Sequence, residues 1–493
     1  MRLTRLKRAG FAALVPAIVP VIVSVFALGL ALPVLAQDAG GGLVSRGEYL
    51  ARAGDCAACH TARDGKPMAG GYVFSMPMGK IVSSNITPSK RFGIGNWTEE
   101  QFARAVRKGV RPDGSHLYPA MPYPSYARIT DADMKALYAY FRQVKPVDAA
   151  PSVKTSLKFP FNLPGMMMGW DLIFANSGPF KDDPKLDAQQ NRGKYLVQGL
   201  AHCSTCHTPR NAFMATDNGK YLAGANVDGW EAPNLTSDKV SGLGGWSDAE
   251  IESYLKNGHA KGKAQAGGPM ADAITHSLHY LSDQDIAAIT AYLRTVPPIR
   301  TEGQSKPSWA VGKAQPVDWT KIEPGMVAAD KPGYRATDNT DGAQLYNTAC
   351  AACHGINGQG SDDGHYPTLT NNSAVGAPKP NNVVMAIVDG IHRKGADGMA
   401  VMPAFSASNQ VIHDTLSDAQ IASVANYVTA TFGNGSAKLT AADIPQIEAG
   451  GAAPWLIRNA ATLFWVGVAV AVIVILLIIA AVVMSRRRKS AAV

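Results

Sequence analysis

All six cysteines of the 493-residue chain fall in three C-x-x-C-H motifs. The motifs are Cys56–His60, Cys203–His207 and Cys350–His354, and each begins 147 residues after the one before. This pattern is typical of c-type haem attachment, in which two thiols bond to the porphyrin and the adjacent histidine binds the iron. We therefore predict three covalently bound haem c groups. The predicted covalent positions are Cys56, Cys59, Cys203, Cys206, Cys350 and Cys353. The predicted proximal iron ligands are His60, His207 and His354.

Other chemistries of paired cysteines fit the sequence less well. Three C-x-x-C disulfides would leave the recurrent histidine unexplained. A thioredoxin-like motif requires a β-α-β context, whereas the flanking patterns here are helical. A structural zinc site requires four ligands, and each unit offers two cysteines and at most two histidines. Haem attachment is therefore the interpretation for all three motifs.

A methionine is expected as the sixth iron ligand in each unit, because Met/His ligation occurs in low-spin electron carriers and raises the reduction potential. Met121, Met270 and Met402 follow the histidine of their motif by 61, 63 and 48 residues. Each stands in a Pro- or Gly-containing stretch ahead of a helix, where a loop can bring its sulfur to the distal face. We predict these three methionines as axial ligands.

Competing assignments of the sixth ligand stay open. Methionine is more often a core filler than a ligand. The alternatives in unit one are Met68, Met76 and Met78, and the alternative in unit three is Met399. Seven other histidines recur at no matching place and are expected to have surface or hydrogen-bonding roles. They are His116, His259, His276, His279, His365, His392 and His413.

The second ring nitrogen of each proximal histidine also needs a partner, often a backbone carbonyl. Pro367, which follows His354, is the predicted acceptor in unit three. The sequence identifies no acceptor for His60 or His207.

The motifs belong to a repeated helical unit. A short helical pattern precedes each motif, and a capped amphipathic helix follows it, with predicted N-caps at Thr130, Ser282 and Ser417. The residues 4, 7 and 11 positions after each cap are apolar, which predicts a helix that packs on the first helix of its unit. The sequence thus predicts an all-α fold: three tandem class I cytochrome c domains and one C-terminal transmembrane helix.

The repeat also sets the expected domain boundaries. We expect domain 1 at 37–150, domain 2 at 185–300 and domain 3 at 335–435. Pro-rich connectors, Lys145–Pro184 and Pro297–Lys331, separate them.

The two ends of the chain carry targeting and membrane signals. Residues 1–36 combine four cations, an apolar run and a small-residue site, which predicts a cleaved secretory signal; the alternative is an uncleaved anchor. Leu463–Met484 is uncharged for 22 residues and is followed by Arg486–Lys489. This predicts a transmembrane helix at 460–485 rather than a buried core helix. By the positive-inside rule, the protein is expected in the inner membrane with its haem domains on the periplasmic side.

The net charge of +9 and the pI near 9.1 first suggest a nucleic-acid surface. However, four cations lie in the signal segment and four follow the span, so the exported body is close to neutral. We therefore expect no nucleic-acid partner. The sequence shows no G-x-G-x-x-G or Walker motif and no nucleophile–base–acid set, so we expect no catalytic residues.

From about Ser45 to Phe432 the chain resembles the three-haem cytochrome c subunits of membrane-bound periplasmic dehydrogenases of acetic acid bacteria. These subunits serve complexes that oxidise alcohol, aldehyde, gluconate, sorbitol or fructose. The resemblance rests on the segments Arg46–Leu50, Cys56–Thr61, Ser84–Pro88, Gly93–Asn96, Leu117–Tyr126, Cys203–Arg210, Gly268–Asp272 and Val401–Pro403.

The resemblance implies a catalytic partner subunit that uses pyrroloquinoline quinone, flavin or molybdopterin, with or without a small subunit. It also implies that the cytochrome passes electrons to ubiquinone. Some members, alcohol dehydrogenase subunits among them, lack a clear C-terminal span. The span in this chain favours another branch, such as aldehyde or gluconate oxidation, and leaves the donor subunit open.

The predicted function is thus electron transfer within a dehydrogenase complex. One alternative is a free-standing membrane-anchored multihaem cytochrome that passes electrons to other carriers or a terminal oxidase. Another is a haem enzyme, peroxidase-like or quinol-oxidising, which would require an open haem site.

Overall fold

The computed structural model of the chain describes residues 42–62, 64–175, 177–312, 338–406, 415–435 and 437–490. The predicted signal segment 1–36, much of the second connector and His413 lie outside the described residues.

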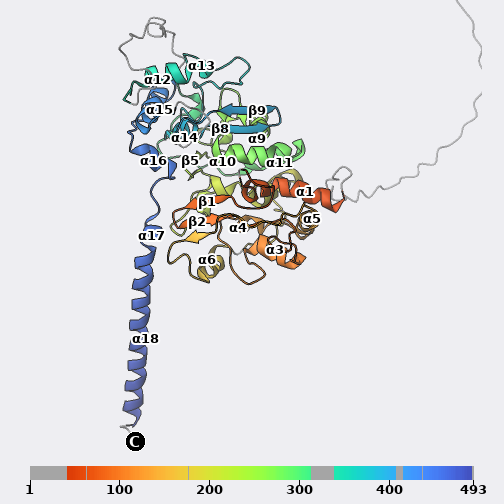
Figure 1. Cartoon of the computed structure of the whole chain (residues 1–493), viewed down its shortest axis with the longest axis vertical. Helices are drawn as coiled ribbons and strands as arrows, with labels where there is room; N and C mark the ends of the chain where they lie inside the picture. The colour runs from red at the N-terminus through yellow and green to blue at the C-terminus, as the bar shows by residue number, and fades with distance from the viewer. Residues whose placement is uncertain are drawn as a thin grey trace, which may run out of the picture. The chain divides into compact units, whose positions relative to one another are not determined.

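The elements follow the predicted repeat (Figure 1). Unit one contains α1 (Leu43–Ala53), α2 (Cys56–His60), β1 (Val73–Met76), β2 (Gly79–Val82), α3 (Glu99–Lys108), α4 (Tyr123–Tyr126) and α5 (Asp131–Phe141). The first connector contributes β3 (Ser156–Leu157) and α6 (Met166–Phe174).

Unit two repeats the same order with additional short turns. Its helices are α7 (Ala188–Tyr195), the π-helix η1 (Leu196–Leu200), α8 (Ser204–His207), η2 (Asn218–Lys220), η3 (Leu243–Gly245), α9 (Asp248–Asn257), α10 (Gly268–His276), η4 (Leu278–Tyr280) and α11 (Asp283–Thr295). Its strands are β4 (Ala225–Val227), β5 (Trp230–Ala232), β6 (His259–Ala260) and β7 (Ala264–Gln265). The turn η5 (Ser308–Ala310) follows in the second connector.

Unit three and the C-terminal segment complete the chain. Unit three contains α12 (Gly342–Ala349), α13 (Ala351–His354), α14 (Asn381–Asp389), β8 (Ile391–Gly395), β9 (Gly398–Met402) and α15 (Asp418–Phe432). The helices α16 (Asp443–Glu448), α17 (Trp455–Arg458) and α18 (Ala460–Ser490) follow it.

The expectation of an all-α fold is not confirmed. The described residues contain nine strands of two to five residues, and all of them pair antiparallel. They form because reversals such as those at Gly79 (φ +131°) and Gly398 (φ +133°) let the loops after the haem motifs fold into hairpins. The fold is therefore helix-rich with short hairpins.

The predicted caps and helix packing are confirmed. The hydroxyls of Thr130, Ser282 and Ser417 each accept a hydrogen bond from the backbone N–H three residues later. The apolar stripe behind each cap is buried, and α5, α11 and α15 pack on α1, α7 and α12 respectively. Each unit is therefore closed by its last helix crossing its first.

A glycine at the same place in each unit makes this crossing close. A Cβ atom added to Gly47, Gly193 or Gly342 would lie 2.0, 1.8 or 2.4 Å from a carbonyl oxygen of the facing helix. Since real Cβ atoms do not approach so closely, any larger residue would push the two helices apart. This explains why the first helix of each unit, ahead of the haem motif, contains a glycine.

Units one and two share one hydrophobic core, whereas unit three has its own. The first cluster contains buried residues from both units, such as Leu50, Leu137, Leu196 and Ile289. The second is built around Leu345 and the apolar stripe of α15. The first two units therefore pack as a joined pair.

Two reciprocal hydrogen bonds join this pair. Tyr195 of unit two donates to the buried carboxylate of Asp133 in unit one, at 2.6 Å. Tyr49 of unit one donates in the same way to Asp285 of unit two, also at 2.6 Å. Burial, together with the nearby Asp285 carboxylate, raises the pKa of Tyr49 to about 12.

Each acceptor carboxylate also binds an arginine of its own unit. Arg46 donates to Asp133, and Arg192 binds Asp285 through Nε and Nη2, both at 2.7 Å. Each aspartate thus ties the last helix of its unit both to the first helix of that unit and to the neighbouring unit.

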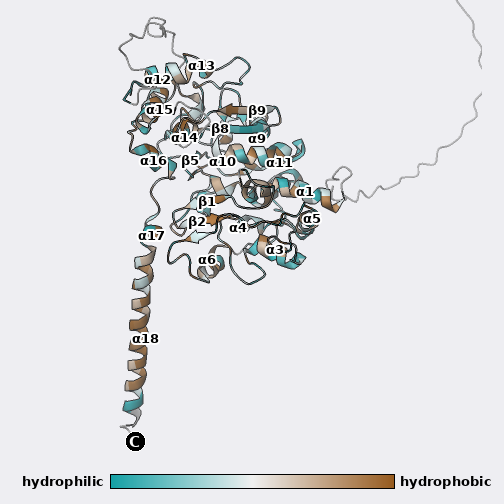
Figure 2. Cartoon of the chain, in the orientation of Figure 1, coloured by the Kyte–Doolittle hydropathy of each residue, from teal (hydrophilic) through white to brown (hydrophobic). Residues whose placement is uncertain are grey.

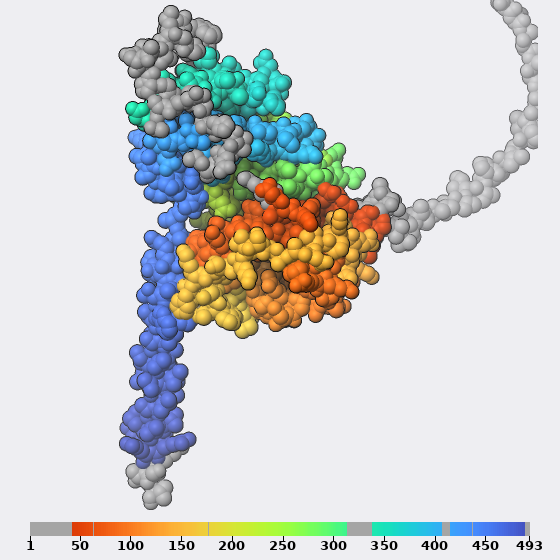
Figure 3. Space-filling view, in the orientation of Figure 1, coloured from red at the N-terminus to blue at the C-terminus, as the bar shows by residue number. Residues whose placement is uncertain are grey.

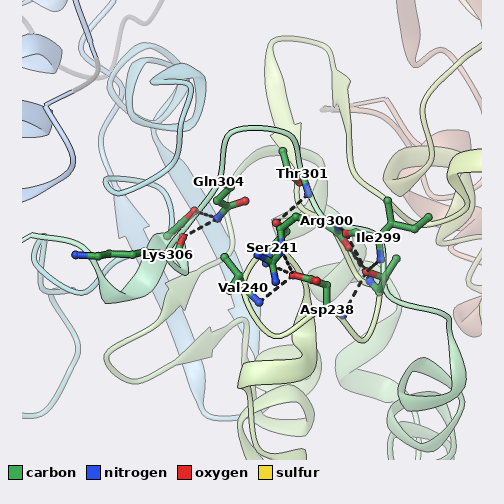
Figure 4. Close-up of polar contacts among 11 residues, drawn as sticks. Asp238, Val240, Ser241, Ile299, Arg300, Thr301, Gln304 and Lys306 are labelled. Carbon is green, nitrogen blue, oxygen red and sulfur yellow. Dashed lines mark hydrogen bonds and ion pairs between the residues drawn. The ribbon is translucent and has the colours of Figure 1, made fainter.

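The second connector begins by folding back on unit two (Figure 4). Arg300 Nε donates to Asp238 Oδ1 at 2.8 Å, and Thr301 N donates to Ser241 Oγ at 3.0 Å. These bonds fix the point where the connector leaves the unit.

The C-terminal helix has the expected membrane character. Within Ala460–Arg488 an 18-residue window has a mean hydropathy of 3.4, and by length and composition the helix can cross a membrane. Figure 2 shows it as hydrophobic along most of its length, with a hydrophilic end.

Replacing Tyr195 by phenylalanine should weaken the joined pair. The change leaves the buried Asp133 carboxylate with one donor fewer, which costs about 1–3 kcal/mol. In guanidinium unfolding of the full chain, the midpoint of the transition of units one and two should move to a lower guanidinium concentration. Tyr49→Phe should lower the same midpoint. Tyr366→Phe, at an exposed tyrosine, is the control. Unfolding of Tyr195→Phe at the midpoint of this control would contradict the account.

Candidate haem-binding sites

The three motifs occupy equivalent places, directly after the first helix of each unit. Their short helices α2, α8 and α13 are five, four and four residues long. None of the six cysteines is in a disulfide, and five of them are partly buried. Burial raises the pKa of the Cys56, Cys203 and Cys350 thiols to about 12. Each motif presents two thiols three residues apart, which is the spacing typical of haem c attachment.

The proximal histidines share one hydrogen-bond pattern. Nδ1 of His60 lies 2.7 Å from the Ser84 carbonyl oxygen, and Nδ1 of His207 lies 2.7 Å from that of Pro233. Nδ1 of His354 lies 3.0 Å from the Pro367 carbonyl oxygen, which confirms the acceptor predicted in unit three.

This pattern prepares the ring for a metal. When Nδ1–H donates to a carbonyl, the proton is fixed on that nitrogen and the Nε2 lone pair is left for an iron. Burial lowers the pKa of all three imidazoles, although the bond to the carbonyl opposes this. The neutral imidazole needed for ligation is thus favoured, and the donor set fits haem c.

Sequence reasoning missed the acceptors in units one and two, although a signal was present. Ser84 and Pro233 each directly precede the asparagine of a shared Asn-x-Thr segment. The Asn85 and Asn234 side chains each accept from the threonine two residues on and donate to a backbone carbonyl after the last helix. The asparagine therefore fixes the loop that offers the carbonyl to the histidine.

The predicted axial methionines lie against the same clusters as the attachment cysteines. Met121 and Met270 pack on the core shared by units one and two, as do Cys56 and Cys203. Met402 packs on the unit-three core, as does Cys350, whereas the alternative Met399 is 65% exposed. In unit one, Met68 and Met78 are buried whereas Met121 is only partly buried, so burial does not favour Met121 over these alternatives.

The histidines expected to have surface or hydrogen-bonding roles have them where they are described. His116 pairs with Asp171 and His259 with Asp397, each at 2.6 Å. His279 bonds a backbone carbonyl. The exposed ones are His276, His365 and His392.

The helix α10, which carries Met270, joins all three sites. It packs on β8 of unit three, whose hairpin ends at Met402, and it also contacts the attachment helix α2 of unit one. Arg393 of β8 reaches into unit two and donates to the Ala266 carbonyl at 3.0 Å. The three candidate sites thus converge around one helix.

Comparison with known proteins settles the family. A family model of cytochrome c matches residues 44–145, 190–297 and 340–431. The chain belongs to the cytochrome c family. As a cytochrome c with three such domains, it carries covalently bound haem c.

Relatives of this cytochrome c align over most of its length. It is 47% identical to the fructose dehydrogenase cytochrome subunit of Gluconobacter japonicus, over 83% of each chain. It is 38% identical to the gluconate 2-dehydrogenase cytochrome c subunit of Pantoea cypripedii, over 85% of this chain and 92% of the relative. It is 39% identical to the cytochrome c subunit of the alcohol dehydrogenase (quinone) of Gluconacetobacter polyoxogenes, over 86% and 88%.

The two methionines of the β8–β9 hairpin provide a matched test of the sixth ligand. Met402→Ala should remove one thioether ligand, so the far-red sulfur-to-iron absorption band of the oxidised full chain should lose the contribution of one haem. Met399→Ala, only three residues away and exposed, should leave the band unchanged. The opposite result would assign the ligand to Met399.

Proposed function

We propose that this cytochrome c is the electron-transfer subunit of a membrane-bound dehydrogenase complex. The observation that carries the proposal is its similarity, across all three haem units, to cytochrome subunits named for fructose, gluconate and alcohol dehydrogenases. The alternative of a free-standing cytochrome has no comparable support.

The proposed haem-binding residues are those predicted from the sequence. The cysteine pair of each motif binds one haem covalently, and His60, His207 and His354 hold the iron from the proximal side. Met121, Met270 and Met402 are the proposed distal ligands. Each bound haem supplies one reversible one-electron step between ferric and ferrous iron.

The arrangement of the three sites supports electron transfer between them. Because α10 contacts both the attachment helix of unit one and the β8–β9 hairpin of unit three, neighbouring haems need no large domain movement to exchange electrons. The buried core and the neutral histidines keep each site preorganised around the iron.

The partner proposed for electron entry is a catalytic dehydrogenase subunit. Its cofactor is proposed to be pyrroloquinoline quinone, flavin or molybdopterin, and a small subunit is proposed to accompany it. Ubiquinone in the membrane is the proposed acceptor.

The proposed topology places one span in the inner membrane. The helix α18 crosses once, Arg486–Lys489 stay cytoplasmic, and the haem units are periplasmic. The proposed division of the chain is a signal peptide at 1–36, haem domains at 37–150, 185–300 and 335–435, and a span at 460–485.

Purification of the tagged full chain from its native membranes tests this function. A large oxidoreductase subunit should copurify in fixed proportion, and its substrate should reduce the haems before ubiquinone reoxidises them. A chain that purifies alone from membranes, with haems that no dehydrogenase substrate reduces, would contradict the proposal. A variant with both Cys350 and Cys353 replaced by serine should retain two haems and copurify with the same partner. Units one and two should stay intact in this variant, because unit three has its own core.

A further inference from the structure

The helix α6 in the first connector is apolar and lies on the surface. None of its nine residues is buried. Met168 is 61% exposed, Leu172 78% and Ile173 70%. Since Met168 and Leu172 are four residues apart, they share one face of the helix. The connector therefore presents a continuous apolar stripe that no described part of the chain covers.

This helix is nevertheless fixed in orientation. Its acidic residue, Asp171, points into unit one, where it accepts a hydrogen bond from Tyr123 Oη at 2.5 Å and lies 2.6 Å from His116 Nδ1. Trp170 Nε1 donates to the Phe213 carbonyl at 2.9 Å. Because these bonds hold the polar side of α6 against the protein, Leu172 and Ile173 are held outward.

The part of the connector that precedes α6, including β3, is also fixed to unit one. β3 pairs with β2 of unit one, and the Tyr118 hydroxyl donates to the Phe161 carbonyl. The space-filling view shows connector residues, in yellow, lying over the surface of unit one, in orange (Figure 3). The segment is thus a fixed part of the surface of unit one.

The same connector touches the start of the membrane-spanning helix. The Phe159 ring lies 5.0 Å from the Phe464 ring and 5.9 Å from the Trp465 ring, measured between centroids, and stacks on the latter. Aromatic residues at the end of a span mark the level of the lipid headgroups. Phe159, only seven residues before α6, is therefore at the membrane surface.

The charges of the connector fit the same surroundings. From 149 to 170 the chain carries no acidic residue, whereas Lys154 and Lys158 are both exposed. Cations beside an apolar helix favour binding at the surface of a membrane that contains anionic lipid.

We propose that residues 159–174 form a second membrane contact, in which the Met168–Leu172–Ile173 face of α6 inserts into the lipid interface beside α18. The inference rests on the membrane span proposed above. The lipid is favoured over a protein partner because the contact with Phe464 and Trp465 continues an interface that is itself lipid-facing.

This contact places unit one at the membrane. Tyr123 and His116, which bind Asp171, flank the loop that carries Met121. Distance along the sequence would instead have pointed to unit three, which directly precedes α18. The fold brings the distal loop of unit one to the lipid surface.

Photo-crosslinking in native membranes tests the contact. The full chain would carry p-benzoyl-phenylalanine at position Leu172, at Ile475 in the middle of α18, or at Val401 on the β8–β9 hairpin. All three positions are at least half exposed, at 78%, 55% and 50%. After irradiation, peptide mass spectrometry would distinguish a phospholipid adduct from a cross-link to protein.

The proposal expects phospholipid adducts at positions 172 and 475 and none at 401. An adduct at 475 together with a protein cross-link, or no adduct, at 172 would overturn the second contact while leaving the span intact. Equal lipid labelling at 172 and 401 would also overturn it. The absence of a lipid adduct at position 475 would contradict the proposed membrane span, and with it the present inference.

Discussion

The hydrogen bond from each proximal histidine to a backbone carbonyl is the interaction on which the rest of the structure depends. A C-x-x-C-H motif binds haem in a defined way only if the imidazole is neutral and its Nε2 faces the iron. The carbonyls of Ser84, Pro233 and Pro367 favour the neutral ring with its proton on Nδ1, which leaves Nε2 for the iron, in the three units. The Asn85 and Asn234 side chains hold two of these loops, and the close glycine crossing of the first and last helices holds the motif behind them.

The units are alike in sequence pattern but not in their surroundings. Units one and two form one packed body, because the buried carboxylates of Asp133 and Asp285 each accept a hydrogen bond from a tyrosine of the other unit. Unit three keeps a separate core and meets unit two through the β8–β9 hairpin and α10. The arrangement gives a chain of neighbouring haem sites in which α10 is common to all three.

The sequence predicted the parts of the fold that follow from local chemistry. The caps at Thr130, Ser282 and Ser417, the buried stripes behind them and the Pro367 acceptor were all predictable from spacing and residue type. The short hairpins were not, because pairs of two to five residues leave too little alternation to recognise. The hydrogen bonds by which Asp133 and Asp285 join units one and two could not be predicted either. Their partners, Tyr195 and Tyr49, lie 62 and 236 residues away in the sequence. The choice of Met121 over Met68 or Met78 rests on repeat spacing, because all three lie close to the core.

The central proposal is that the protein carries electrons through three haems, each with both axial positions occupied by its own histidine and methionine. Carbon monoxide binding to the dithionite-reduced full chain tests this claim most directly, because the gas binds ferrous haem only where an axial position is free or readily exchanged. The account predicts that none of the three haems changes its spectrum under carbon monoxide. A carbon monoxide complex at one haem would contradict it and would indicate an enzyme with an open site.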